Sequence, residues 1–280
     1  MDQSTHYKVN MNITFIGGGN MAAALISGLL RQGFTAEQLH VVEINAENCE
    51  KLKLDFGILA TSDLADGVAR GDVVLLSVKP QQLYELTKDL ASLLKDQLII
   101  SIAAGIRASD IMRWLGGYER VVRAMPNTPS LVRSGVTGLY AASRVNDQDK
   151  SNAESILAAV GTTLWVAEEE MLHAVTAISG SGPAYVFYFI ESMQQAGIEL
   201  GLTPAQARQL SLQTFVGASK LASLSDEDVV TLRTRVSSKG GTTERAIQAM
   251  EKSDIKCKII TAIHAASDRS HEMSDEFGRR

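Results

Sequence analysis

The 280-residue sequence is poor in cysteine, proline and long hydrophobic runs, and it carries no excess of positive charge. Its two cysteines, Cys49 and Cys257, are too few for a disulfide framework or a cysteine-based metal cluster. Only five prolines occur, and no apolar run reaches the roughly 18 residues of a membrane-spanning helix. The net charge of −5 argues against a general basic field for binding nucleic acid. Residues 1–10 lack the apolar segment of a signal peptide, so we expect a soluble, cytoplasmic protein without nucleic-acid or membrane partners.

What the sequence does contain is an alternation of short β-branched runs and helical patterns that starts at Asn12. The runs 73–76 and 98–100 are apolar without alternation, which is typical of strands covered on both faces. Strands that alternate with helices of about 10–15 residues indicate parallel βαβ units. The expected strands are 13–16, 40–43, 73–78, 98–102, 121–125, 136–140 and 164–166, and the expected helices between the early ones are 21–32, 46–56, 82–94 and 109–115.

The pattern changes near residue 168, after which helical stretches follow one another without a β-branched run bounded by turn signals. Pro183 and Pro204 lie where the first turn of a helix tolerates proline. We therefore expect an α/β domain over residues 11–168 and an all-helical domain over residues 169–276. The helices expected there are 170–178, 183–199, 204–221, 226–236, 243–252 and 255–271.

The segment 13–22 reads as a strand, a glycine turn and the start of a helix. In its G-x-G-x-x-A pattern, Gly17 permits the tight turn and Gly19 lets the backbone approach a pyrophosphate, while Ala22 keeps the helix close to the strand. Glu43 ends the next strand at about the 20-residue spacing expected of a carboxylate that binds a ribose. A structural glycine turn with a solvent-facing glutamate is the alternative. The pattern predicts dinucleotide binding, with Gly18, Asn20 and Met21 in the same turn.

The residues around Glu43 bear on the choice of dinucleotide. Glu43 favours NADH because a carboxylate repels a 2′-phosphate, and the neighbouring Glu47 provides no basic partner for that phosphate. A flexible loop at Asn45 still admits NADPH. We expect use of NADPH or NADH and leave the preference open.

Further candidates follow from the rule that ligands of open parallel sheets lie beyond the carboxyl ends of the strands. Lys79, Asn127 and Thr128 are polar groups at such ends, and the small residues at 103–105 leave room for a ring. A solvated lysine and a rigid proline turn over 126–129 are the alternatives. The cofactor-binding candidates at these ends are Val78, Lys79, Pro80, Ala103, Ala104, Gly105 and Asn127.

Two small-residue segments stand out in the helical half. Residues 179–185 place small residues and a proline at a helix start, which predicts exposed N–H groups. Residues 236–244 form a second glycine-rich loop that opens a helix, and such a loop can present N–H donors to a carboxylate. Two ordinary helix caps are the alternative.

The remaining polar residues give no catalytic set from spacing alone. The five histidines predict no Ser–His–Asp arrangement, and no His, Cys, Asp or Glu cluster shows metal-ligand spacing, so we expect no metal. The acidic run 168–170 is interpreted as a favourable helix N-terminus. The histidines are His6, His40, His173, His264 and His271.

Six motifs, taken in order, resemble a known family. Together they are similar to pyrroline-5-carboxylate reductase, and the similarity runs from about residue 12 to 272. The first motif is common to many dehydrogenases, whereas the last two in this order are far more specific. The motifs are FIGGGNMA (15–22), VKP (78–80), AAG (103–105), MPNTP (125–129), SGSGPAY (179–185) and SKGGTT (238–243).

The resemblance implies reduction of 1-pyrroline-5-carboxylate to L-proline with hydride from NAD(P)H, the last step of proline biosynthesis. It implies a Rossmann-type domain followed by an all-α dimerisation and substrate domain, with an active site shared between subunits of a homodimer or higher homo-oligomer. It places Lys79 and Asn127 along the cofactor and Thr243 at the ring nitrogen, as the catalytic residue. The substrate carboxylate is expected at Ser238 and the N–H groups of Gly240, Gly241, Thr242 and Thr243.

Two residues depart from the family pattern. Lys239 stands where many members have proline, and Glu43 argues against a strict NADPH preference.

The implied reaction needs little from side chains. A protonated cyclic imine is already an electrophile, so a strong side-chain base is unnecessary, and positioning can supply about 7–11 kcal/mol of the barrier.

Two alternative functions remain, one of them an enzyme of similar layout and the other a protein without catalytic activity. A 3-hydroxyacid dehydrogenase of similar layout needs a base, and its family has a lysine on the helix after the loop near residue 180. Residues 183–200 contain no lysine. A non-catalytic nucleotide-sensing protein would lack the second glycine loop, which is intact at 238–243.

Overall fold

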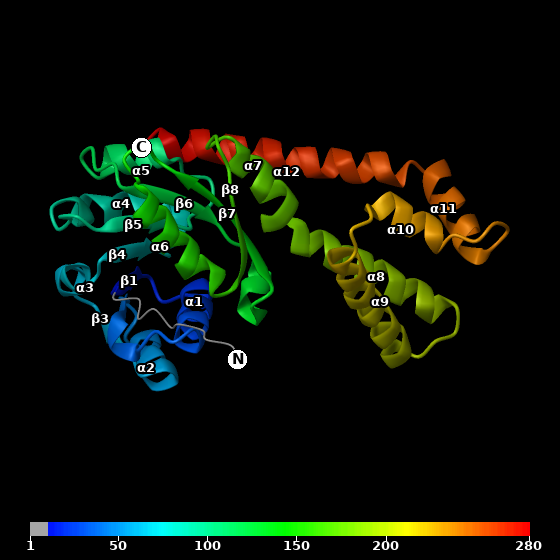
Figure 1. Cartoon of the computed structure of the whole chain (residues 1–280), viewed down its shortest axis with the longest axis horizontal. Helices are drawn as coiled ribbons and strands as arrows, with labels where there is room; N and C mark the ends of the chain where they lie inside the picture. Colours follow the sequence, from blue (N-terminus) through cyan, green and yellow to red (C-terminus); the bar gives the residue numbers. More distant parts are fainter. Residues whose placement is uncertain (1–10) are drawn as a thin grey trace. The chain divides into compact units, whose positions relative to one another are not determined.

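The computed structural model describes residues 11–280 and divides into two compact units (Figure 1). The first unit comprises residues 11–180 together with the C-terminal residues 266–280, and the second comprises residues 181–265. This division differs from the expected boundary at residue 168, because the chain between 169 and 180 and the end of the last helix pack with the α/β unit. None of the helices described between residues 11 and 280 is long and apolar enough to cross a membrane.

The first unit is built on one eight-stranded sheet with the order β3-β2-β1-β4-β5-β6-β7-β8. The order of its first six strands is that of the doubly wound dinucleotide-binding fold, in which the chain reverses direction across the sheet between β1 and β4. Strands β7 and β8 extend the sheet beyond this core. The strands are β1 (Ile13–Ile16), β2 (Leu39–Val42), β3 (Leu59–Thr61), β4 (Val73–Leu76), β5 (Leu98–Ser101), β6 (Val121–Met125), β7 (Gly135–Ala141) and β8 (Gly161–Trp165).

Helices connect the strands and cover the sheet (Figure 1). Strands β1, β2, β4 and β5 are buried along their whole lengths, as expected for parallel strands covered on both faces. The helices of this unit are α1 (Asn20–Arg31), α2 (Ala46–Phe56), α3 (Leu64–Arg70), α4 (Pro80–Ala91), α5 (Ala108–Trp114), α6 (Asp147–Ala158) and α7 (Met171–Val175). Shorter helical turns are η1 (Ala36–Gln38), η2 (Thr128–Val132) and η3 (Thr176–Gly180), the last a π-helical turn.

Four elements of the first unit differ from the sequence expectations. Strand β7 is antiparallel to β6, because the short η2 turn returns the chain as a hairpin where a parallel pair needs a crossover. Strand β3 is only three residues long and half exposed, too short for a recognisable β-branched run. Helices α3 and α6 were also not predicted, although side chains cap both of them, Asp63 at α3 and Asn146 at α6.

The C-terminal residues of the first unit pack against the sheet's connecting loops. A Cβ on Gly105 would lie 3.0 Å from Cβ of Met273, and Phe277 is buried in the same core. Helix α7, which follows the expected boundary at residue 168, also packs on the sheet. Its Leu172 is buried, and a Cβ on Gly138 of β7 would lie 2.6 Å from its Val175. These contacts explain why the expected boundary does not coincide with the compact units.

The second unit is entirely helical. Helices α8 and α9 pack closely, since a Cβ on Gly197 would lie 3.1 Å from Ala207, which is buried. In one chain, large apolar side chains remain exposed on these helices, among them Phe187 at 67% and Tyr188 at 69%. The elements are α8 (Gly182–Glu199), α9 (Pro204–Leu224), α10 (Val229–Arg235), α11 (Thr242–Lys252) and α12 (Ile255–Gly278), whose last residues belong to the first unit.

Candidate active site

A cleft of about 440 Å³ lies at the carboxyl ends of β1, β2 and β4, where a doubly wound sheet binds its ligand. The glycine turn 17–19, Glu43 and the segment 77–79 all line it. Ser62 and Leu64 also line the cleft, and they come from the β3–α3 connection that the sequence analysis missed. The remaining lining residues are Ile16, Val42, Ile44, Gln82, Leu86 and Asp89.

The glycine turn is closely packed on two sides and open on the third. Gly17 has φ of +98°, and a Cβ there would lie 2.9 Å from the carbonyl oxygen of Ser77. A Cβ on Gly18 would lie 2.4 Å from Cδ1 of Leu52. A Cβ on Gly19, by contrast, would meet nothing within 4 Å among the described residues. The turn therefore leaves space at Gly19, where the sequence predicts that a pyrophosphate approaches.

Helix α1 begins at this turn with its first N–H groups available. Gly19 is the N-cap residue, and among residues 11–280 no side chain caps the helix. Its first turn also lacks acidic residues, which would otherwise satisfy the positive end of the helix dipole. An N-terminus of this kind favours an anion, so the residues present fit the pyrophosphate of a dinucleotide.

Glu43 is held by the same turn. Its Oε2 accepts hydrogen bonds from the Gly18 N–H at 3.0 Å and from Nδ2 of Asn48 at 2.9 Å, and its Oε1 accepts one from the Asn45 N–H at 2.8 Å. Burial opposes ionisation of Glu43, but these hydrogen bonds outweigh it and hold the pKa of the carboxyl below its usual value. Glu43 is therefore a fixed negative charge in the cleft, as well as a support for the turn.

The segment after β4 pins the turn from the other side. The Ser77 hydroxyl donates to the carbonyl oxygen of Gly17 at 2.7 Å, a role that the sequence analysis missed. Lys79 is the N-cap residue of α4 and is followed by Pro80 at the first helical position. Of the three candidates at this strand end, Val78 and Lys79 line the cleft, and Pro80 is not among its lining residues.

Two other groups of predicted cofactor-binding residues, Asn127 and residues 103–105, are not among the lining residues of this cleft. Asn127 is buried, with its Oδ1 accepting from the Val136 N–H at 2.9 Å and its Nδ2 donating to the Ser179 carbonyl at 3.1 Å. Its amide therefore joins protein segments and does not line the cleft. Residues 103–105 are also absent from the described lining of the cleft, and the space beside Gly105 is filled by Met273. Asn45 caps α2, with its side chain accepting from the Asn48 N–H at 2.9 Å.

The first small-residue segment of the helical half has a different conformation from the expected loop. Residues 176–180 form a π-helical turn, and α8 begins at Gly182 with Pro183 in its first turn. The Ser179 hydroxyl donates to the Val175 carbonyl at 2.9 Å. Because the helical backbone continues through this segment, it offers fewer free N–H groups than the sequence analysis expects.

The second glycine loop opens α11 in the second unit. Gly240 has φ of +76°, and Gly241 is the N-cap residue, with no side-chain cap on this helix in the described chain. The Gly240 N–H donates to Oε2 of Glu244 at 2.6 Å, and the Gly241 N–H donates to the Ser238 carbonyl at 2.9 Å. Of the expected anion-binding N–H groups, the two glycine groups thus have partners within the chain. The N–H groups of Thr242 and Thr243 lie in the uncapped first turn.

The comparisons with known proteins agree with this arrangement. A family model described as pyrroline-5-carboxylate reductase dimerisation matches residues 169–273, and one described as NADP oxidoreductase, coenzyme F420-dependent, matches residues 12–105. A pyrroline-5-carboxylate reductase of Pseudomonas aeruginosa is 45% identical over 95% of this chain and 98% of its own length. The chain belongs to the pyrroline-5-carboxylate reductase family.

Solved structures show the same similarity. A pyrroline-5-carboxylate reductase from Coxiella burnetii matches with a TM-score of 0.90 and 42% identity, over 94% of this chain and 98% of that one. The Plasmodium falciparum pyrroline carboxylate reductase, solved with NADP bound, matches with a TM-score of 0.85 and 29% identity, over 95% of this chain and 98% of that one.

The family placement confirms several expectations. The protein reduces 1-pyrroline-5-carboxylate to L-proline with hydride from NAD(P)H, and its fold is a Rossmann-type domain followed by a helical dimerisation domain. The match to the dimerisation model indicates a homo-oligomer. The two alternatives, a 3-hydroxyacid dehydrogenase and a nucleotide sensor, are thereby set aside.

Substitutions in the glycine turn are expected to separate folding from cofactor binding. Gly17→Ala places a side chain at positive φ against the Ser77 carbonyl, so the free energy of unfolding should fall by roughly 1–3 kcal/mol. Gly19→Ala meets open space at an ordinary φ of −70°, so its unfolding free energy should change by less than about 0.5 kcal/mol.

The dissociation constant for the reduced cofactor should rise about tenfold in Gly19→Ala, because the added methyl group obstructs the phosphate approach. Urea denaturation and fluorescence titration measure the two quantities. Equal losses of stability in the two variants would contradict this account of the turn.

Proposed function

We propose that the glycine turn and the α11 loop are the two anion-binding sites of this reductase. The first would hold the dinucleotide through the N–H groups at the start of α1, with Gly17, Gly18, Gly19, Asn20 and Met21 forming the turn. The observation that carries this proposal is the pair of glycine-capped helix starts that lack a side-chain cap, α1 and α11, among the helices described for residues 11–280. Each offers N–H donors to a negative charge.

The proposal gives the α11 loop the substrate carboxylate. Thr242 and Thr243 supply N–H groups of the uncapped first turn, and the Ser238 side chain lies exposed beside them. For the Gly240 N–H to contact the substrate as well, the Glu244 carboxylate that it now binds must give way. A carboxylate at this position supports the assignment, because it marks the loop as a place where an anion is favourable.

The reaction requires little from side chains beyond this positioning. When bound, the reduced nicotinamide supplies the hydride, which adds to the C=N carbon while the ring nitrogen keeps the proton of the iminium form. We propose that the Thr243 hydroxyl contacts the ring nitrogen and orients the imine. Holding the reacting groups in place supplies about 7–11 kcal/mol of the barrier in well-oriented reactions.

We propose further that the active site is shared between subunits of a homodimer or a higher homo-oligomer. The exposed apolar side chains of α8 and α9, with Phe187 and Tyr188 among them, form a face that a second copy would cover. A dimer of this kind lets the α11 loop of one subunit serve the cofactor bound by another. The cytoplasm is the proposed location, in keeping with the unpaired state of Cys49 and Cys257.

The role of Thr243 predicts a defect in turnover alone. Thr243→Ala should lower kcat by roughly a hundredfold, because the hydroxyl that orients the ring nitrogen is lost. The dissociation constant for NADPH should stay within about twofold of its original value, since Thr243 and the glycine turn lie in different units.

Steady-state kinetics and cofactor titration check this prediction, and Thr243→Ser, which keeps the hydroxyl, serves as the matched control. A kcat in Thr243→Ala equal to that of the control would remove Thr243 from the reaction.

The fixed charge of Glu43 predicts the cofactor preference. Glu43→Gln keeps the shape of the side chain but removes the charge that repels a 2′-phosphate, so the ratio of kcat/KM for NADPH to that for NADH should rise about tenfold. Because the pKa of Glu43 lies below its usual value, the effect should not vary between pH 6 and pH 8.

Glu47→Gln is the control, since Glu47 is a nearby exposed carboxylate that does not line this cleft. Equal changes in the two variants, or an equal effect on both cofactors, would argue against the assignment of Glu43.

A shared site predicts complementation between two inactive variants. Gly19→Asp places a carboxylate where the pyrophosphate approaches, and Thr243→Ala impairs the substrate loop. In a mixed dimer, one of the two sites combines the intact halves of both subunits. Co-expression should therefore restore up to about a quarter of the original activity, because half of random pairs are mixed. If the mixture is no more active than the separate variants, each site belongs to a single subunit.

A further inference from the structure

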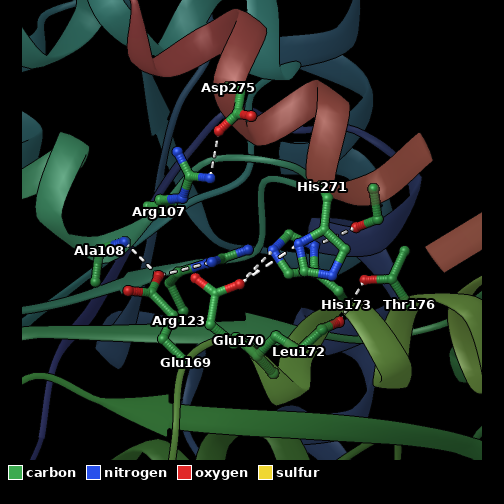
Figure 2. A network of polar contacts seen from close by, with 11 residues as sticks. Arg107, Ala108, Arg123, Glu169, Glu170, Leu172, His173, Thr176, His271 and Asp275 are labelled. Atoms are coloured by element: carbon green, nitrogen blue, oxygen red, sulfur yellow. Dashed lines mark hydrogen bonds and ion pairs between the residues drawn. The ribbon is translucent and has the colours of Figure 1, made fainter. Parts of the chain in front are cut away.

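A cluster of potential metal ligands lies in the first unit, away from the nucleotide cleft. It consists of Glu170, His173 and His271, which come from the start of α7 and from α12 (Figure 2). Each residue offers one ligand atom, and the three atoms lie within 4.8 Å of one another. The sequence shows no metal-ligand spacing here because His271 is remote from the other two residues along the chain.

The distances fit tetrahedral coordination. Oε2 of Glu170 is 3.5 Å from Nε2 of His173 and 3.5 Å from Nδ1 of His271. Ligand atoms about 2.0–2.2 Å from a tetrahedral zinc ion are about 3.4 Å from one another. The two imidazole rings lie nearly stacked, with centroids 3.7 Å apart and a tilt of 31°. Both nitrogen lone pairs can point at one ion only if the half-exposed His271 ring rotates away from this stacked arrangement.

The surroundings prepare His173 to act as a ligand. Its Nδ1 is 2.8 Å from the hydroxyl of the buried Ser270, and an N–H donated from this nitrogen leaves Nε2 unprotonated. Nε2 is the His173 nitrogen that lies 3.5 Å from the Glu170 carboxylate, so this tautomer keeps its lone pair on the side of the proposed ion.

Two arginines lie near the cluster, and each is paired with a carboxylate that offsets its charge. Arg123 pairs with Glu169 at 2.6 Å, and Arg107 pairs with Asp275 at 2.5 Å, so both guanidinium groups have their own carboxylates (Figure 2). Glu170 forms no ion pair with a lysine or arginine in the described part of the chain, although Arg107 is near enough to interact with its charge at longer range. Its negative charge is therefore available to a bound ion.

We propose that Glu170, His173 and His271 bind one divalent transition-metal ion, with zinc as the best match and a fourth position left for water. Two imidazoles and one carboxylate suit zinc, whereas magnesium and calcium prefer oxygen ligands alone. The ion would join α7 to the end of α12 within the first unit. It would act on the attachment of this helix and not on the reduction itself.

Calorimetric titration of the chelator-treated full-length protein with Zn²⁺ tests the proposal, and Co²⁺ provides a visible spectrum of tetrahedral coordination. One ion per chain is expected. His271→Ala and Glu170→Gln should each weaken binding by roughly a hundredfold. His264→Ala, an exposed histidine of the same helix outside the cluster, should leave binding unchanged. Affinity should also fall as the pH drops from 7.5 to 5.5, because protons compete for the imidazoles.

Thermal unfolding gives a second measurement. At about a hundredfold excess of zinc over its dissociation constant, the Tm of the original protein should rise by about 5 °C, and that of His271→Ala should not. Because Glu170 and His271 are exposed, both substitutions are compatible with the fold. The proposal fails if no ion binds, or if His271→Ala binds zinc as tightly as His264→Ala does. Neither result bears on the reductase activity, which is assayed separately.

Discussion

The close approach of the β1–α1 turn to the end of β4 is the constraint on which the nucleotide cleft depends. Gly17 lies so near the Ser77 carbonyl that no Cβ fits, and the Ser77 hydroxyl donates back to the Gly17 carbonyl. The Gly17 N–H donates to the Val42 carbonyl, and the Gly18 N–H donates to Glu43, so β2 joins the same network. Three neighbouring strands thus fix the direction in which α1 begins. The open space at Gly19 exists because the rest of the turn is immobilised.

The helices differ in how the N–H groups of their first turns are satisfied. Helices α2, α3, α6, α9 and α10 each have an Asn, Asp or Thr whose side chain accepts an N–H of the first turn. Helix α5 lacks such a cap of its own, but the carboxylate of Glu169 accepts the Ala108 N–H at 2.6 Å. At α1 and α11 the N-cap residue is a glycine, and the described chain provides no side-chain cap. Side-chain caps are also absent at α4, α7 and α8, whose N-cap residues are Lys79, Glu170 and Ser181. What sets α1 and α11 apart is therefore the glycine at the N-cap, which places no side chain in front of the first N–H groups.

The sequence was sufficient for features that depend on local pattern. The buried strands β1, β4 and β5 and the glycine turn could be predicted from the sequence, because each depends on the residue types of one short, continuous segment. Features set by long-range packing were not visible. The hydrogen bonds by which the Asn127 amide joins β7 to the π-helical turn were not predictable, and neither was the contact of Gly105 with Met273, which is remote in sequence. The cofactor-binding roles of Asn127 and residues 103–105 stay predictions. The Asp63 cap was the one local signal that could have revealed α3 and, with it, Ser62 and Leu64 in the cleft.

The acidic run 168–170 is another feature whose contacts could not be predicted from the sequence. The sequence indicates a favourable helix N-terminus, whereas in the structure Glu169 and Glu170 contact residues that are distant along the chain. Glu169 binds Arg123 of β6 and the start of α5, while Glu170 faces the two histidines. Asp275 and His271 of α12 reach the same region (Figure 2).

The end of the last helix is therefore held to the first unit by apolar contacts at Met273 and Phe277 and by this polar group. Apolar contacts respond little to pH or metal concentration, whereas histidine–carboxylate contacts respond to both. An ion that binds only the folded arrangement stabilises it increasingly as its concentration rises above the dissociation constant, so the proposed site would make the attachment of the end of α12 depend on metal concentration.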